Sequence, residues 1–230
     1  MVQIKNSWIA LLLLGASSLL GACLDDNEKN YSQLTIGTIQ VIEGNDYFFQ
    51  LDPGSKMYPG DTTRIHNYPL KHGQRAFINF DLLDEKIPGY DYNAVIYQIE
   101  NILTKDIIRI PSDEVEENVG KDRINITNIW LSEGFINIQY QFFYDDKSDK
   151  KHLLNLVVNE NKPENEGNTD YLTLEFRRNG YNEHESVLGR GLASFRLDNI
   201  MPDLAGKKGI LIRYHSLYEG EIEKKIDFTK

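Results

Sequence analysis

The 230-residue chain has one cysteine, Cys23, so it cannot form an internal disulfide and must take its stability from hydrophobic cores. Its formal net charge of −10 disfavours binding to nucleic acid and to anionic lipid headgroups. The apolar run from Trp8 to Leu20 is interrupted by small and polar residues. It is too short to fill the roughly 20 positions of a membrane-spanning helix. A transmembrane protein and a nucleic-acid-binding protein are therefore not expected.

Sequence motifs that carry catalysis or bind metals are also missing. There is no phosphate loop, no nucleophile elbow and no pair of histidines one helical turn apart. Only His66 and His72 lie close together, near Asp61, whereas a transition-metal site usually needs three or more protein ligands. The chain has 35 acidic residues, so pairs of carboxylates at glycosidase-like spacing arise by chance. We predict no catalytic residue, no bound metal and no cofactor, and hence a protein that is not an enzyme.

The N-terminus has the pattern of a lipoprotein signal peptide. Lys5 precedes the apolar run, and Leu20, Gly21, Ala22 and Cys23 form a lipobox. We expect cleavage after residue 22 and attachment of acyl chains such as palmitate to Cys23. Two or three acyl chains hold a protein firmly on a membrane. Removal of residues 1–22, which include Lys5, would change the formal charge from −10 to −11.

An acidic tether, residues 23–33, is expected to follow the lipid. Asp25 and Asp26 resemble the export signal by which some Gram-negative anaerobes send lipoproteins to the cell surface, although a plain solvated leader explains them as well. We therefore predict a lipid-anchored outer-membrane protein on the cell surface, with the periplasm-facing leaflet as the alternative.

The rest of the sequence predicts an all-β protein, because short alternating runs are bounded by turn residues. Residues 34–110 are expected to form an OB-like barrel with a long connection after the third strand, and a six-stranded meander is the alternative. The five expected strands are Leu34–Val41, Tyr47–Leu51, Lys56–Tyr58, Gln74–Leu82 and Tyr92–Ile102.

A linker, residues 111–123, is expected to separate the barrel from a second domain. Asp113 and Glu116 have capping-box spacing, so a short helix should end at Gly120. Residues 124–230 are expected to form an immunoglobulin-like β-sandwich with Trp130 in its core. Its clearest strand, Phe135–Tyr144, should have one buried and one wet face. The other expected strands are Ile124–Leu131, His152–Val158, Tyr171–Arg177, Leu192–Asp198, Ile210–His215 and Glu221–Phe228, and a mobile loop is expected over 159–170.

The chain resembles the NigD-like lipoproteins, which have an N-terminal OB-type domain and a C-terminal β-sandwich. The resemblance rests on Cys23 with Asp25 and Asp26, and on the order of the segments Gly73–Ala76, Tyr97–Asp106, Ile126–Leu131, Leu172–Arg177 and Arg190–Phe195. It implies fold and location, and it suggests a link to bacteriocin production or immunity. It does not imply an activity, because fold alone does not confer function.

Tyrosine is the one abundant residue type that suggests recognition. Tyr58, Tyr68 and Tyr90 fall in turn-rich segments where a barrel exposes its loops, although packing explains tyrosines there at least as well. The leading hypothesis is a non-enzymatic binding or accessory protein whose partner is an envelope protein or a secreted toxin-like peptide. The alternatives are a glycan-binding accessory module of a polysaccharide-uptake system and, less favoured, a hydrolase.

Overall fold

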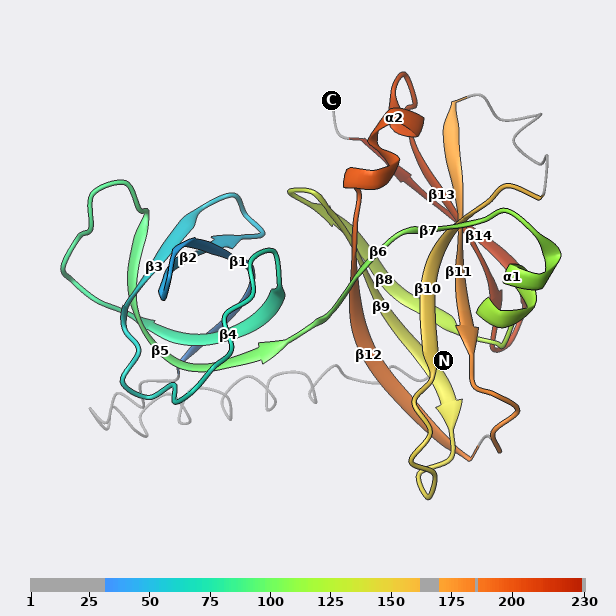
Figure 1. The fold of residues 1–230 in the computed structure, drawn as a ribbon, viewed down its shortest axis with the longest axis horizontal. Helices are drawn as coiled ribbons and strands as arrows, with labels where there is room; N and C mark the ends of the chain where they lie inside the picture. The colour runs from blue at the N-terminus through green and yellow to red at the C-terminus, as the bar shows by residue number, and fades with distance from the viewer. Residues whose placement is uncertain (1–31, 162–169, 185, 229–230) are drawn as a thin grey trace, which may run out of the picture. The chain divides into compact units, whose positions relative to one another are not determined.

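A closed five-stranded barrel forms the first half of the computed structural model, which describes residues 32–161, 170–184 and 186–228. The strand order is β1-β2-β3-β5-β4, and β1 closes the ring because it pairs antiparallel with both β2 and β4. The expected OB-like barrel is confirmed. Its strands are β1 (Gln33–Glu43), β2 (Asp46–Leu51), β3 (Lys56–Asp61), β4 (Arg75–Leu82) and β5 (Tyr92–Asn101) (Figure 1).

Alternate residues of these strands point inward and fill the barrel, as the period of two requires. Side chains from the long connection between β3 and β4 pack against this interior. The buried interior consists of Ile39, Tyr47, Phe49, Leu51, Met57, Ala76, Ile78, Phe80, Ala94 and Ile96.

Two packed sheets form the second half, which confirms the β-sandwich and the all-β class. The first sheet contains, in order, β14 (Gly220–Asp227), β13 (Gly209–Ser216), β11 (Tyr171–Asn179), β10 (Leu153–Asn159) and β7 (Ile108–Ile110). The second contains β6 (Leu103–Asp106), β12 (Val187–Arg196), β9 (Phe135–Tyr144) and β8 (Asn125–Ser132). Their facing sides bury a core that includes Ile136, Ile138, Leu156, Leu174, Phe176, Phe195 and Ile212.

Residues 103–110 differ from the expectation that they belong to the barrel. β6 pairs in parallel with β12, and β7 pairs in parallel with β10. The sandwich therefore has nine strands among the described residues, two more than the seven expected from residues 124–230. A short strand that pairs in parallel with a distant partner leaves no local turn signal, so the sequence pattern did not reveal these two.

The expected short helix is α1 (Asp113–Val119), and Gly120 ends it with a φ of 81°. Val115 and Val119 pack on β7 and β10 as a small separate core. The expected capping box is wrong: Ser112 is the N-cap, and no side chain caps the helix. The Glu116 carboxylate instead accepts a hydrogen bond from Arg177 at 2.9 Å.

Two short helical turns, η2 (Asp198–Ile200) and α2 (Met201–Leu204), connect β12 to β13. No helix among the described residues is long and apolar enough to cross a membrane. The expected signal peptide and tether lie almost entirely in residues 1–31, outside the described part of the chain, and the expected mobile loop lies mostly within residues 162–169, also outside it.

Candidate functional site

A buried arginine links the barrel to the sandwich. Arg75 begins β4, and its side chain is only 1% exposed. Its Nη1 and Nη2 atoms donate to the two carboxylate oxygens of Asp52 at 2.5 and 2.8 Å, and Nη1 also donates to Thr38 Oγ1 at 3.2 Å. Asp52 follows β2 in the turn that leads to β3. This fork-to-fork geometry fixes both side chains, because the guanidinium and the carboxylate match in shape.

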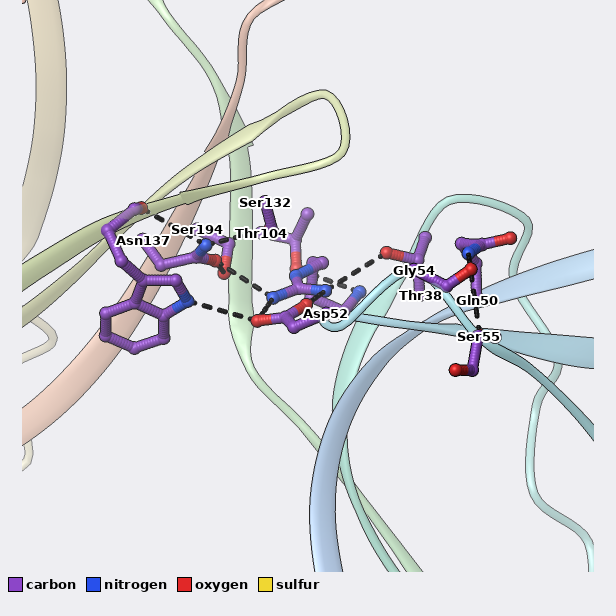
Figure 2. A network of polar contacts seen from close by, with 11 residues as sticks. Thr38, Gln50, Asp52, Gly54, Ser55, Thr104, Ser132, Asn137 and Ser194 are labelled. Carbon is purple, nitrogen blue, oxygen red and sulfur yellow. Dashed lines mark hydrogen bonds and ion pairs between the residues drawn. The ribbon is translucent and has the colours of Figure 1, made fainter. Parts of the chain in front are cut away.

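Side chains of the sandwich complete this arrangement (Figure 2). Trp130 Nε1 donates to Asp52 Oδ2 at 3.1 Å, and Arg75 Nη2 donates to Asn137 Oδ1 at 3.1 Å. Asn137 is fully buried, accepts from Ser194 Oγ at 2.7 Å, and donates through Nδ2 to Ser132 Oγ at 2.9 Å. We call Thr38, Asp52, Arg75, Trp130, Ser132, Asn137 and Ser194 the junction network.

The junction network corrects two expectations about the second domain. Trp130 is half-buried beside Asp52 and is not in the sandwich core. The outer face of β9 is not wet at Asn137, because Arg75 of the barrel contacts it there. The barrel and the sandwich are therefore joined by side-chain hydrogen bonds as well as by the continuous chain.

A groove of about 640 Å³ lies further along the same strands. The barrel contributes Phe77, Glu100 and Asn101, and the sandwich contributes side chains from β6, β8, β9 and β12. The lining combines amide and apolar side chains with one carboxylate, Glu100, and one guanidinium, Arg190. Such a lining suits recognition of a surface without net charge. The sandwich residues that line it are Leu103, Thr127, Gln139, Tyr140, Gln141, Arg190, Gly191 and Leu192.

Glycine at position 191, beside the groove, leaves room for the ring of Tyr140, its partner on β9. A Cβ atom at this position would lie 2.4 Å from Tyr140 Oη and 2.5 Å from Tyr140 Cζ. The aromatic ring therefore occupies the space where a side chain would stand. Burial of the ring raises the pKa of Tyr140 above its usual range.

The structure separates the three tyrosines proposed as a binding platform. The ring centroids of Tyr58 and Tyr90 are 5.1 Å apart, and the two rings are tilted by 43°. The ring of Phe48 packs on Tyr90 with a centroid distance of 5.6 Å. Tyr68 instead packs against the barrel interior and donates from its hydroxyl to Asn101 Oδ1 at 2.5 Å. Tyr58 and Tyr90 can act together, whereas Tyr68 orients a residue that lines the groove.

The predicted lipidation and export residues fall outside the described part of the chain. These are the lipobox residues Leu20, Gly21 and Ala22, the acylation site Cys23, and the export pair Asp25 and Asp26. They remain predictions.

A cluster of charged side chains lies beside α1 on the outer side of the five-stranded sheet. Arg177 bridges the carboxylates of Glu116 and Glu175, and all three residues are buried. Hydrogen bonds from Lys121 and Arg177 lower the pKa of Glu116. Glu116 is therefore a buried, paired carboxylate, and its role here is to attach the helix to the sheet.

His152 and Glu183 form a buried hydrogen-bonded pair at the end of the sandwich. His152 Nε2 lies 2.5 Å from Glu183 Oε2, and Arg178 Nε donates to His152 Nδ1 at 3.3 Å. Hydrogen bonds from Ser148 and His152 lower the pKa of Glu183 to about 2. Across residues 32–161, 170–184 and 186–228, no three histidine, cysteine or acidic side chains gather to hold a metal ion.

Sequence reasoning did not find the junction network or the groove. Gly73–Ala76 and Ile126–Leu131 were noted for their family resemblance and as parts of strands, but no contact between Arg75 and the second domain, or between Trp130 and the barrel, was predicted. The usable signal was Arg75, the one cation of its strand, since a buried strand cation needs an acidic partner.

Two family models match the chain. The NigD-like N-terminal OB domain matches residues 36–102, and the NigD-like C-terminal β-sandwich domain matches residues 106–229. None of the curated proteins matches it.

Several solved structures are similar over most of the chain. A protein of unknown function from Bacteroides vulgatus is 25% identical with a TM-score of 0.72, covering 86% of this chain and 92% of that one. A NigD-like immunity protein from Bacteroides caccae is 16% identical with a TM-score of 0.62, covering 84% and 91%. A protein from Bacteroides fragilis, provisionally described as a lipoprotein, is 13% identical with a TM-score of 0.60, covering 86% and 99%. The last two likenesses are of fold alone. With both domain models matched in order along the chain, this protein belongs to the NigD-like family.

Proposed function

We propose that this protein is a non-enzymatic accessory lipoprotein of the outer membrane that binds a partner polypeptide in the groove between its barrel and its sandwich. The observation that carries the proposal is the groove itself, which both domains line. The junction network supports it, because fixing the barrel on the sandwich preforms the groove and lowers the entropy lost on binding.

Membership of the NigD-like family and similarity in fold to a NigD-like immunity protein support an accessory or immunity role. Display at the membrane rests on the lipobox at Leu20–Cys23, and surface exposure rests on Asp25 and Asp26. A lipid tether would hold the groove close to envelope proteins and to secreted bacteriocin-like peptides. Such a protein needs only to bind, so its recognition surface can be built without catalytic groups.

The test uses residues 24–230, immobilised and exposed to envelope proteins and secreted peptides from the same cells. Leu103 is 43% exposed in the groove, and Leu82 is 48% exposed at the end of β4. Leu103→Asp should reduce retention of the partner at least tenfold, whereas Leu82→Asp should leave it unchanged. The retained partner should keep its mass. Equal retention by the two variants, or chemical conversion of the partner, would contradict the proposal.

A further inference from the structure

One edge of the four-stranded sheet is open along most of β12. The strand spans Val187–Arg196, and β9 pairs with all of it from the other side. β6 pairs only with Ala193–Arg196. No strand among the described residues pairs with the first six residues of β12, Val187–Leu192, on this side (Figure 1). Since every second residue of a strand directs its N–H and C=O to the same side, about three donors and three acceptors face outward.

This edge is open because the residues that directly precede β6 belong to the barrel. Ile102, the residue before β6, donates its backbone N–H to Arg75 O at 2.9 Å and so belongs to the barrel side. No residues of β6 are therefore available to pair with Val187–Leu192. Arg190, Gly191 and Leu192 of this open segment line the groove, with Glu100 and Leu103.

The other sheet edges carry features that oppose pairing with a further strand. β14 has five charged side chains in eight residues, and β7 has only three residues. The register of β8 shifts between Ile126 and Asn128, and Lys224 Nζ donates to Ile126 O at 2.7 Å.

The open segment of β12 lacks such protection. Val187–Leu192 contains one charge, Arg190, and no proline, and its register with β9 is unbroken. Val187 and Leu188 are 37% and 38% exposed. A regular, largely apolar edge of this kind is a template for another strand.

We infer that the groove takes its partner as an added β-strand: an extended polypeptide segment of about six residues pairs with the backbone of Val187–Leu192. Phe77 of the barrel lines the groove together with Leu103 and Leu192, so apolar side chains are favoured at alternate positions of the added strand. Main-chain hydrogen bonds supply affinity, and the flanking side chains supply selectivity, as in other strand-addition complexes. This inference rests on the proposed function and specifies how the partner binds.

The experiment pans a phage library of random twelve-residue peptides against residues 24–230, because the natural partner is unidentified. Enriched peptides should carry alternating apolar residues. A synthetic copy should slow hydrogen exchange of the outward-facing amides of Val187–Leu192 at least tenfold, with no change in β14. Two N-methylated peptides are compared, one methylated at odd-numbered amides and one at even-numbered amides. One of them should bind at least tenfold more weakly and the other almost unchanged, because only one set of amides faces β12.

Three results would overturn strand addition. The first is that no peptide is enriched. The second is that neither N-methylated peptide loses affinity. The third is that Val187–Leu192 is protected because two copies of the chain pair with each other. If an envelope polypeptide still requires Leu103 in those cases, the proposed function stands and only this mode of binding fails. If no partner requires Leu103, the proposed function itself fails.

Discussion

Replacing Asp52 by alanine should destabilise the protein by about 3–5 kcal/mol, the usual cost of removing one partner from a buried ion pair. Arg75 would keep Thr38 and Asn137 as hydrogen-bond acceptors but would lose its only carboxylate, while its side chain stays 1% exposed. Asp52 is 18% exposed, so water can partly replace it, and the lower end of the range is favoured. At about 2–4 °C per kcal/mol, the melting temperature should fall by about 6–20 °C.

The assay can observe the junction directly. The chain contains two tryptophans, Trp8 and Trp130, and only Trp130 remains in residues 24–230. Its indole N–H donates to Asp52. Fluorescence of Trp130 should therefore shift to longer wavelength in Asp52→Ala before unfolding, as water reaches the indole, and urea titration followed by the same signal gives the free energy of unfolding.

Asp203→Ala is the matched control, because it also removes an aspartate from an arginine. The Arg109–Asp203 pair is on the surface, with side chains 39% and 32% exposed, so its loss should cost at most about 1 kcal/mol. If the two variants lose equal stability, or if Asp52→Ala leaves the emission of Trp130 unchanged, the junction network does not hold the barrel on the sandwich.

Three further outcomes are expected. Cys23→Ser should abolish incorporation of labelled palmitate, and label on the variant would refute the lipobox assignment. Gly191→Ala should destabilise by about 1–3 kcal/mol in urea titration, because its Cβ would overlap the ring of Tyr140; an unchanged midpoint would mean that the ring moves freely. Since the pKa of Glu183 is lowered to about 2 in the folded protein, its carboxylate stabilises the fold above the usual pKa near 4.5, and this contribution is lost as the pH falls towards 2. The free energy of unfolding should therefore change less between pH 6 and pH 3 in Glu183→Gln than in the wild type. An identical change in both proteins would rule out the proposed contribution of the pair that Glu183 forms with His152.

Alternation of apolar residues was enough to predict the barrel and most sandwich strands, because the core-facing residues of these strands recur at every second position. The start of β12 was missed, since Val187–Gly191 contains two glycines and an arginine and shows no alternation. Asn137 and Trp130 were misplaced for a different reason. Periodicity reports which residues share a face, but it cannot report that the barrel contacts the polar face of β9.

The candidate site was less predictable than the fold. The sequence placed Tyr58 and Tyr90 in exposed segments, and the structure brings them together. The groove depends on where β6 begins and on which backbone groups of β12 lack a paired strand. Both are properties of strand pairing between distant segments, and no local pattern records them.

The pairing of β6 with β12 also has a consequence for the order of folding. All five barrel strands lie within residues 33–101, so the barrel can form once that stretch is available. Leu103 pairs with Ala193, which is 90 residues later in the chain (193 − 103), so the four-stranded sheet cannot be completed until almost the whole chain is present. Closing so long a loop costs entropy and slows folding. During folding, the finished barrel would therefore wait for the sandwich, and apolar strands such as β9 would be the segments that most need protection from aggregation in that interval.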